Sequence, residues 1–444
     1  MTDWIGAAEA AERLGIKQAS LYAYVSRGVL TRRKDADGRV SMFDLAEIEQ
    51  LVRRGRPRRA GAAAELVIES ALTEITSRTQ RYRGYDATDL ALRCSFEDVA
   101  MLLWAGMLPG AAAGAAESAG APGDAGTVPR SRWSATPDAL AAGRAAQAAL
   151  PPGTLPLERI QVIVPALAVT DPFRLHLDPP AVVAAGMSLI AGMTDALPPA
   201  TAGNAASQTG GPQVGTGTPA EAAGTGNRIA ARLATRLCAN PAPASLIRVI
   251  SAALVLVADH ELAASTLAAR VAASMRADPY AVVSTGLGAM TGALHGGAAL
   301  GAEIMLGSAN SPADAPRVVG DVLRRGERLP GFGHFVYRDG DPRANLLLRL
   351  IAEYAPDSER LAVASAVTAE ARRRALPNPN IEFALAVLVG VAGMIRGAGE
   401  AMFAVGRTAG WLAHAMEEYE RNVPIRPRCV YTGPVAVTQS AAEA

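Results

Sequence analysis

The sequence predicts an all-α protein of two to three domains, with a small winged helix-turn-helix module at its N-terminus. Most of the 444 residues carry Ala/Leu/Val-rich helical patterns broken by Gly and Pro, and no series of alternating strands is found. Charge is concentrated at the start of the chain. Residues 1–60 hold 12 Lys or Arg against eight Asp or Glu, whereas the whole chain carries a net charge of only +1.

Lysine usage excludes several chemistries for most of the chain. Only two of the 43 basic residues are lysines, Lys17 and Lys34. After residue 34 there is therefore no lysine for a phosphate-binding GxxxxGK loop, a Schiff base or an ammonium general base.

Cysteine spacing and hydropathy indicate the cellular compartment and argue against a metal site and a membrane span. The three cysteines, at 94, 238 and 429, are far apart and outside any CxxC pattern, so neither a disulfide framework nor a zinc site is expected. The start of the chain lacks a basic stretch followed by an apolar one. The longest apolar stretches fall short of the roughly 18–20 residues that a membrane helix needs. We expect a cytoplasmic protein that binds no metal and no membrane.

Residues 1–56 are predicted to form a separate module. Ala7–Leu14 has helical spacing, and a second short helix over Gln18–Arg27 ends at Gly28, a residue common at helix C-termini. A basic ribbon over 30–40 follows, with a DG turn at 37–38. A last helix is expected over Met42–Arg54. Two helices joined by a Gly-containing turn and followed by a basic hairpin are typical of a winged helix-turn-helix.

This module resembles the winged helix-turn-helix of the MerR and excisionase type, which implies double-stranded DNA as a partner. The second helix would reach base edges or phosphates, and the wing would contact phosphates. The candidate DNA-binding residues are Gln18, Ser20, Tyr22, Arg27, Arg32, Arg33, Lys34 and Arg39. The same amphipathic helices would also suit a docking or dimerisation module, and the sequence leaves both possibilities open.

Residues 57–64 are predicted to be a flexible basic linker. Two later stretches, near 110–128 and 197–226, are rich in Ala, Gly, Pro and Thr and contain almost no aromatic or charged residues. Such stretches bury too little apolar surface to offset the entropy of ordering them. We therefore expect disordered insertions in an otherwise helical body.

Three of the five histidines lie in distinctive settings within 75 residues. His260 stands in VADHELAAST, which we interpret as a buried helix with a carboxylate on either side of the histidine. His295 precedes two glycines, and His334 ends the glycine turn GFGH. One such histidine alone would more often be a core residue, but three together favour a functional site. His176 and His414 are expected to be structural.

Charged residues that could complete this site follow His334. Arg343 lies in the first turn of a helix that Asp341 is expected to cap. Glu382 lies in the first turn of an apolar helix capped by Asn380, where the positive end of the helix favours an ionised carboxylate. Further candidates are Arg338, Arg407 and Arg426.

Three histidines, one carboxylate and several arginines suit a small substrate with more than one negative charge. Arginine binds carboxylates in a bidentate manner. Histidine polarises carbonyls and transfers protons, and a carboxylate can remove a proton alpha to a carbonyl. No HExxH, GxSxG or GxGxxG motif supports a competing scheme.

In this order, the segments resemble the citrate synthase family. The motifs are RYRGYDATDL, ADHELAAST, LHGGA, GFGH with DPRA, PNIEF, and GRTAGW with RPR, and they extend over most of residues 65–435 apart from the two insertions. The N-terminal module lies outside the resemblance. The resemblance implies a homodimer, with a large helical domain at 65–296 and 397–444 and a smaller helical domain at 297–396 that closes over the substrates.

The resemblance also implies roles for individual residues. His260, His334, Arg343 and Arg407 would hold oxaloacetate, with Arg426 reaching in from the second subunit, and His334 would polarise and protonate the oxaloacetate carbonyl. His295 would donate a hydrogen bond to the acyl-CoA thioester. Arg338 would contact a CoA phosphate, and Gly331 and Gly333 would offer backbone groups to its adenine.

The implied reaction joins acetyl-CoA or propionyl-CoA to oxaloacetate, with Glu382 as general base. Thioester hydrolysis then releases citrate or 2-methylcitrate and CoA, with acyl-CoA as a cosubstrate and no tightly bound cofactor. The two acyl chains differ by one methylene, worth about 1–3 kcal/mol in a pocket, and no residue named above decides between them.

One position departs from the family. The family's general base is an aspartate, and the matching residue here is Glu382, whose carboxylate lies one methylene further from the backbone. A displacement on the order of 1 Å can lower a rate about a hundredfold. Three interpretations therefore remain: an active condensing enzyme, a DNA-binding regulator whose synthase-like domain senses oxaloacetate or acyl-CoA, and a scaffold with an inactive site.

Overall fold

The structure, a computed structural model, describes residues 4–14, 18, 21, 24–25, 30–35, 40–53, 68–108, 133–200, 228–292 and 297–433. The chain divides into two compact units, residues 1–69 and residues 70–444. The predicted linker at 57–64 and the predicted insertion at 110–128 lie outside the described residues. So does the predicted insertion at 197–226, apart from its first four positions.

The N-terminal unit combines short helices with a three-stranded antiparallel sheet. Helix α1 (Ala7–Leu14) has the predicted bounds. Strands β1 (Trp4–Gly6), β2 (Arg32–Lys34) and β3 (Ser41–Asp44) are arranged in the order β1-β3-β2. Strand β2 lies within the predicted basic ribbon over 30–40 and pairs antiparallel with β3, but β3 begins at residue 41, beyond that ribbon. The DG turn lies outside the described residues.

The predicted helix over Met42–Arg54 is wrong at its start. Residues 41–44 form the central strand β3, and helix α3 spans Leu45–Arg53. Met42 pairs with β1 on one side and β2 on the other, and Phe43 is fully buried in the core of the unit. This pairing overrides the local helical pattern. Asp44 then starts the helix, because its Oδ1 accepts a hydrogen bond from Ala46 N (2.8 Å).

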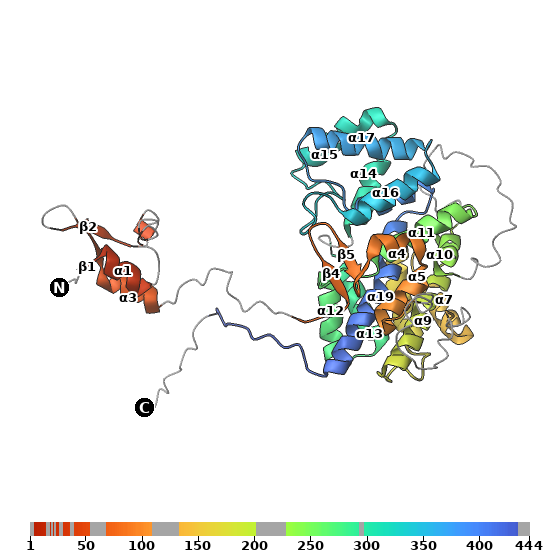
Figure 1. Cartoon of the computed structure of the whole chain (residues 1–444), viewed down its shortest axis with the longest axis horizontal. Helices are drawn as coiled ribbons and strands as arrows, with labels where there is room; N and C mark the ends of the chain where they lie inside the picture. Colours follow the sequence, from red (N-terminus) through yellow and green to blue (C-terminus); the bar gives the residue numbers. More distant parts are fainter. Residues whose placement is uncertain are drawn as a thin grey trace, which may run out of the picture. The chain divides into compact units, whose positions relative to one another are not determined.

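The second unit is a mainly helical body, which confirms the predicted class (Figure 1). Its helices are α4 (Ala87–Arg93), α5 (Phe96–Ala105), α7 (Pro137–Ala148), α8 (Pro156–Ala168), α9 (Pro179–Asp195), α10 (Ile229–Leu237), α11 (Ala244–Val257), α12 (Ala264–Ser274), α13 (Pro279–Met290), α14 (Gly297–Gly307), η3 (Pro312–Asp314), α15 (Ala315–Arg324), α16 (Pro342–Tyr354), α17 (Glu359–Arg373), α18 (Ile381–Val391) and α19 (Ala398–Arg421).

A small antiparallel sheet in this body was not predicted. It consists of β4 (Thr73–Ile75), β5 (Gln80–Tyr82) and β6 (Tyr85–Asp86). The turn from β5 to β6 uses positive φ angles at Arg83 (46°) and Gly84 (87°). Strands of two or three residues are too short to give a recognisable alternation in the sequence.

Helix α19 runs through the middle of the body, where it packs against α5, α9, α11, α12 and α13 (Figure 1). It is buried along most of its 24 residues. Glycines on α19 let α11 approach closely, and Gly410 N donates a hydrogen bond to Ala258 O (2.9 Å) just beyond the end of α11. Helices α14 and α16 pack on α18, and α15 packs on α17.

Gly410→Ala is expected to destabilise the body strongly. A Cβ at this position would lie 2.4 Å from Ala258 O and 2.4 Å from Asp259 Oδ1, so α11 and α19 would have to move apart. Overpacking of this kind costs about 3 kcal/mol, which urea unfolding would measure. The control is Gly288→Ala on α13, where the added Cβ meets no atom within 4 Å. That change should stabilise the helix by up to about 1 kcal/mol, and equal effects of the two variants would contradict the prediction.

Candidate active site

The glycine turn GFGH is held against the start of α18 by three hydrogen bonds. Gly333 N donates to Asn378 O (2.8 Å), Asn380 N donates to Gly331 O (2.9 Å), and Asn380 Nδ2 donates to Gly333 O (2.9 Å). Gly331 has a φ of +77°, and a Cβ there would lie 2.9 Å from the backbone of α18. Because only glycine allows this contact, the turn carries His334 to the first turn of α18.

Two backbone hydrogen bonds hold the ring of His334 in one tautomer. Its Nδ1 accepts from Val336 N (3.0 Å) and from Tyr337 N (3.2 Å), so the ring proton lies on Nε2. Burial, together with the positive charge of Arg343, lowers the pKa of His334 to about 4. The ring is therefore neutral near pH 7 and offers its Nε2–H as a hydrogen-bond donor.

His260 lies in a turn beyond α11, so its prediction as a helical residue is wrong. Helix α11 ends at Val257, and Glu261 adopts a left-handed φ of 51°. The carbonyl of Ala258 accepts its hydrogen bond from Gly410 of α19 instead of continuing α11. A tertiary contact thus ends the helix, and the apolar run before it gave no local sign of this.

The ring of His260 meets that of His334 edge to face, with ring centroids 5.1 Å apart. Burial lowers the pKa of His260 well below its usual range, and the charges of Arg343 and Arg407 add to this effect. Its Nε2 is buried and has no hydrogen-bond partner among the described residues. A neutral imidazole with an unused nitrogen is suited to binding a polar group of a substrate.

Arg343 is a buried guanidinium in a bidentate pair with Asp341. The Nε–Oδ1 distance is 3.0 Å and the Nη2–Oδ2 distance is 2.8 Å. Asp341 caps α16, as predicted, and its Oδ2 also accepts from Ile381 N (3.1 Å), so one carboxylate joins the starts of α16 and α18. Burial acts to lower the pKa of Arg343, but Asp341 raises it above its ordinary value. Arg343 therefore stays charged.

Arg407 reaches inward from α19. Its Nε donates to Val257 O (2.7 Å), and its guanidinium lies 4.6 Å from the ring centroid of Phe403. Its Nη1 is buried and has no partner in the described part of the chain. Burial lowers the pKa of Arg407 to about 10, with Asp259 acting in the opposite direction. The group is charged at neutral pH and has a donor available for a carboxylate.

Glu382 lies in the first turn of α18, which Asn380 caps as predicted by accepting from Phe383 N (3.3 Å). Burial raises the pKa of Glu382, and the charge of Arg343 opposes that shift. Its Oε2 is buried without a hydrogen-bond partner among the residues described. A buried carboxylate with a raised pKa and an unused oxygen is a candidate general base.

The structure brings five predicted site residues into one electrostatic neighbourhood, here called the histidine–arginine cluster. Its members are His260, His334, Arg343, Arg407 and Glu382. His295 lies outside the described residues. Arg338 is exposed after the glycine turn and Arg426 is exposed after α19. Neither of these arginines forms a side-chain hydrogen bond or ion pair with described residues.

Sequence reasoning missed Tyr337 as a member of this neighbourhood. The buried phenol ring stacks on His334 with centroids 4.6 Å apart and meets His260 edge-on at 5.6 Å. Its hydroxyl donates to Gln80 Oε1 (3.4 Å) on β5. Only its position three residues after His334 could have indicated this role, and a lone aromatic residue in a turn is a weak signal.

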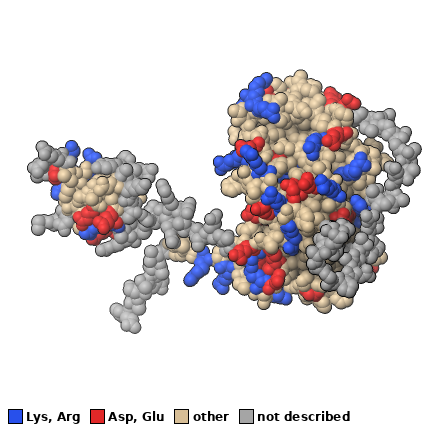
Figure 2. Space-filling model, viewed as in Figure 1, with Lys and Arg blue, Asp and Glu red and all other residues tan. Residues whose placement is uncertain are grey.

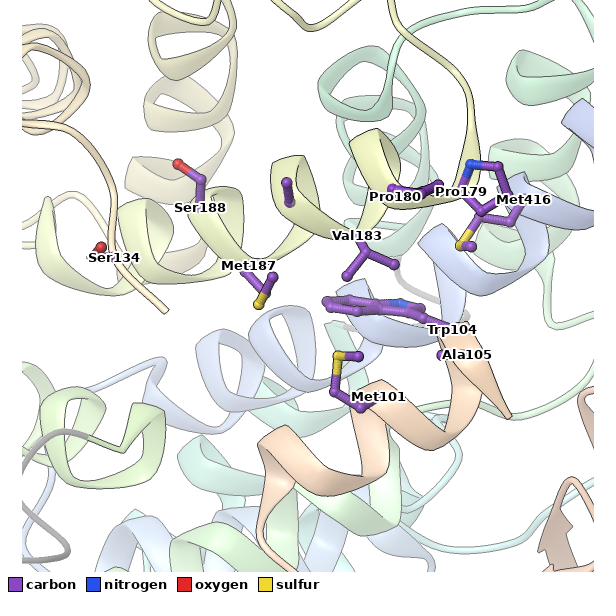
Figure 3. A pocket seen from close by; sticks show the side chains of 11 residues that line it. Met101, Trp104, Ala105, Ser134, Pro179, Pro180, Val183, Met187, Ser188 and Met416 are labelled. Atoms are coloured by element: carbon purple, nitrogen blue, oxygen red, sulfur yellow. The ribbon is translucent and has the colours of Figure 1, made fainter. Parts of the chain in front are cut away.

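A separate apolar cavity of about 550 Å³ lies between α5, α9 and α19 (Figure 3). The ring of Trp104 lies between Met101 and Val183, with Met187 and Met416 nearby. The lining contains no titratable side chain and shares no residue with the histidine–arginine cluster. This cavity offers no groups for acid–base chemistry.

The N-terminal candidates are only partly within the described residues. Ser20, Tyr22, Arg27 and Arg39 lie outside them, and Gln18 is exposed in a helical position. Strand β2 presents three consecutive exposed basic residues, Arg32, Arg33 and Lys34. The guanidinium of Arg33 lies 4.1 Å from the ring centroid of Trp4. In Figure 2, the visible acidic side chains of this unit gather mainly in one patch.

Within the described ranges, Cys94, Cys238 and Cys429 are free thiols. No group of three or more His, Cys, Asp and Glu side chains there is placed to hold a metal ion. Among the helices that the structure describes, none has the length and apolar character needed to cross a bilayer.

The part of the chain that holds the histidine–arginine cluster is similar to known proteins. The family model for the citrate synthase C-terminal domain matches residues 61–428. A 2-methylcitrate synthase of Mycobacterium tuberculosis is 31% identical over 379 residues, which cover 84% of this chain and 90% of that protein. A putative citrate synthase 2 of the same species is 43% identical over 212 residues, 46% of this chain. That match spans only 56% of the relative's length.

Solved structures share the fold. A citrate synthase of Thermoplasma acidophilum, solved as a ternary complex with carboxymethyl coenzyme A and oxaloacetate, superposes with a TM-score of 0.64 at 23% identity. The superposition covers 84% of this chain and 96% of that one. The citrate synthase of Thermotoga maritima gives a TM-score of 0.63 at 23% identity, covering 85% and 96% of the two chains.

Proposed function

Because the chain belongs to the citrate synthase family, we propose that it is a condensing enzyme that joins an acyl-CoA to oxaloacetate and hydrolyses the thioester. The observation that carries this proposal is the histidine–arginine cluster. Two neutral histidines, two charged arginines and a carboxylate with a raised pKa come together from four separate parts of the chain.

Oxaloacetate is a dicarboxylate with a ketone, and the cluster offers a group for each part. Arg407 has a donor available for a carboxylate, and Arg343 provides the second positive charge. In this proposal the His334 Nε2–H donates to the ketone oxygen, which is supported by the two backbone N–H groups that occupy Nδ1. A neutral donor polarises the carbonyl in the way that an oxyanion site does.

Glu382 is the base in this proposal, and its unused Oε2 would take a proton from the acyl carbon next to the thioester. We assign to His295 the hydrogen bond that stabilises the enol oxygen. The enol carbon then bonds to the ketone carbon of oxaloacetate, whose oxygen takes the Nε2 proton of His334. The proton that Glu382 removed from the acyl carbon then restores the neutral imidazole and leaves Glu382 ionised. Water cleaves the thioester, and the products are CoA and citrate or, from propionyl-CoA, 2-methylcitrate.

The proposal includes a homodimer in which Arg426 of one subunit completes the oxaloacetate site of the other. The exposed apolar side chains of this unit support a surface that a second subunit would cover. They are Val169, Phe173 and Leu175 between α8 and α9, and Met275 after α12. In the same proposal, residues 297–396 form the smaller domain that closes over the substrates. Arg338, Gly331 and Gly333 face CoA in this proposal.

Release of free thiol tests the proposed reaction. The purified protein should liberate CoA thiol from acetyl-CoA or propionyl-CoA only when oxaloacetate is present, because the enol forms in a site completed by oxaloacetate. A thiol reagent measures the rate, and the ratio of the two rates gives the acyl preference. If neither acyl-CoA releases thiol but calorimetry shows that oxaloacetate binds, the proposed enzyme function is wrong and the protein is a sensor of oxaloacetate.

We further propose that the N-terminal unit binds double-stranded DNA. The observation that favours it is the edge strand β2, whose three consecutive basic side chains are all exposed on the hairpin. Phosphate contacts by such a strand are independent of base sequence and release counterions.

Affinity for a mixed-sequence DNA duplex is expected to fall steeply with salt. The combined change Arg32→Gln and Lys34→Gln should weaken binding and make the plot of log affinity against log salt concentration less steep. Each contacted phosphate contributes about −0.9 to the slope of that plot, so the loss of two contacts should reduce its steepness by about 1.8. Fluorescence anisotropy between 50 and 200 mM salt is the measurement. The matched control is Arg324→Gln plus Arg349→Gln, two exposed arginines of the body, and an equal loss in the control would contradict the proposal.

A further inference from the structure

Asp259, the residue before His260, carries a fully buried carboxylate that the reaction as described does not use. We propose that Asp259 and His414 are positioning residues of the oxaloacetate site, joined in a buried hydrogen-bond chain that starts at Arg270. The inference rests on the proposed function, because the groups that they position are His260 and Arg407. His414, predicted only as a structural histidine, lies on α19 two turns beyond Arg407.

The partners of His414 determine its tautomer. Arg270 Nη1 lies 2.6 Å from His414 Nδ1, and a guanidinium can only donate, so Nδ1 is the acceptor. The ring proton is then on Nε2, which lies 3.2 Å from Asp259 Oδ2. Arg270 thus directs the single N–H of a neutral imidazole at Asp259.

Two arginines and two glutamates surround the start of this hydrogen-bond chain. Arg270 is fully buried and pairs with Glu418 (2.5 Å) and Glu417 (2.6 Å). Arg421 lies 3.6 Å from Glu418. These two positive and two negative charges balance one another, which leaves the charge of Asp259 to be balanced on the other side, by Arg407.

Asp259 faces the oxaloacetate site through Arg407. Burial acts to raise the pKa of Asp259, but hydrogen bonds from His414 Nε2 (3.2 Å) and Thr73 Oγ1 (2.5 Å), together with the positive charge of Arg407, lower it. Among the described residues no carboxylate is hydrogen-bonded to Arg407, and of the carboxylates that raise its pKa Asp259 has the largest effect, ahead of Glu382. In this way a residue that need not touch substrate contributes to the ionisation of a substrate-binding guanidinium.

The backbone of Asp259 is held as firmly as its side chain. Its carbonyl accepts a hydrogen bond from Gln80 Nε2 (2.8 Å), and its N–H donates to the hydroxyl of Tyr82 (3.4 Å), both buried on β5. Gly410 of α19 packs directly against Oδ1, where a Cβ would approach to 2.4 Å. A residue fixed at both its carbonyl and its carboxylate sets the direction of the next side chain, which is His260.

The same hydrogen-bond chain includes the first residues of the second unit. Glu417 Oε1 accepts from Ala71 N (2.8 Å) and Ser70 Oγ (3.2 Å), and Thr73 on β4 donates to Asp259. Residues 70–73 are therefore part of the positioning chain, and they directly follow the N-terminal unit in the sequence.

Substitutions at His414 test the inference in the full-length protein. His414→Gln keeps a donor toward Asp259 and an acceptor toward Arg270, whereas His414→Phe removes both. We expect the glutamine variant to retain oxaloacetate KM within about threefold, and the phenylalanine variant to raise it at least tenfold with a smaller change in acyl-CoA KM. Tyr419→Phe is the matched control. It deletes a hydrogen bond of the same helix, to Ala277 O (2.6 Å), that is not connected to Asp259.

Oxaloacetate KM within twofold of wild type in a folded His414→Phe variant would overturn the inference, as would an equal rise in the Tyr419→Phe control. If His414→Phe does not fold, Thr73→Val replaces it, because this near-isosteric change deletes one hydrogen bond to the same carboxylate. A fivefold rise in oxaloacetate KM with unchanged circular dichroism would then support the inference, and no rise would overturn it.

Nuclear magnetic resonance of the histidine ring nitrogens separates this inference from the proposed function. Long-range proton–nitrogen spectra, with the His414 signals assigned by their loss in His414→Gln, should show a protonated Nε2 and an unprotonated Nδ1 at pH 7. A protein that shows this tautomer but neither turns over nor binds oxaloacetate would refute the proposed function alone. A protonated Nδ1 would refute the hydrogen-bond chain whatever the activity.

Discussion

Glu382→Gln is expected to lower kcat by about 10²–10⁴-fold while oxaloacetate affinity changes little. General-base catalysis contributes typically about 10²–10⁴-fold, and an amide cannot take the proton. The binding groups for oxaloacetate are instead the histidines and arginines of the cluster. Stopped-flow thiol release and calorimetry with oxaloacetate measure the two quantities separately.

The control for this variant is Glu400→Gln, which changes another buried carboxylate, on α19, that is not in the cluster. Activity should be retained in that variant. If Glu382→Gln turns over at the wild-type rate, another residue is the base. Glu382→Asp introduces the family's residue, and comparison of its kcat with wild type shows whether the longer side chain places the carboxylate well.

The raised pKa of Glu382 also gives a direction for the pH profile. The base acts only when ionised, so kcat/KM should rise as the pH increases through the raised pKa of Glu382 and level off above it. His334, with its pKa lowered to about 4, is already neutral across that range and should add no inflection above pH 6.

Arg407→Gln is expected to weaken oxaloacetate binding by roughly 30-fold or more. Loss of one partner of a buried charged hydrogen bond costs about 2–5 kcal/mol, and the free Nη1 donor of Arg407 is the group that the substrate carboxylate would take. Calorimetry with oxaloacetate is the measurement. The control is Arg360→Gln, an arginine outside the cluster that also donates to a backbone carbonyl, Ala309 O (2.7 Å).

Arg407→Lys should not restore the affinity. The site lowers the pKa of an arginine to about 10, and a lysine begins from about 10.4, so the same burial would move the pKa of its ammonium toward neutral pH. Lysine also lacks the planar fork that binds a carboxylate in a bidentate manner. A lysine variant with wild-type affinity would mean that charge alone, without the fork, binds the substrate.

The elements that local patterns predicted well share a physical reason. Caps and glycine turns act over a few residues, so Asp341 and Asn380 could be identified as N-caps and GFGH as a turn from the sequence alone. The same holds for Ala7–Leu14, whose helical period is complete within eight residues. Each of these features needs no information from distant parts of the chain.

The misassigned elements depend on distant contacts. Residues 41–44 form a strand because β1 and β2 lie on either side of them, although their own pattern continues into a helix. His260 leaves α11 because Gly410, 150 positions later, takes the carbonyl of Ala258. Propensity is a weak determinant where such contacts compete with it.

The sequence by itself determined the helical class, the family resemblance and the residue types of the cluster, because these depend on local periodicity and on motifs. Only the tertiary structure decided the protonation of those residues and their partners. Which nitrogen of His334 or His414 carries the proton depends on the groups that reach the other nitrogen. The ionisation of Arg407 depends on burial by α11 and on Asp259. These are properties of packing between segments far apart in the chain, and no run of residues encodes them locally.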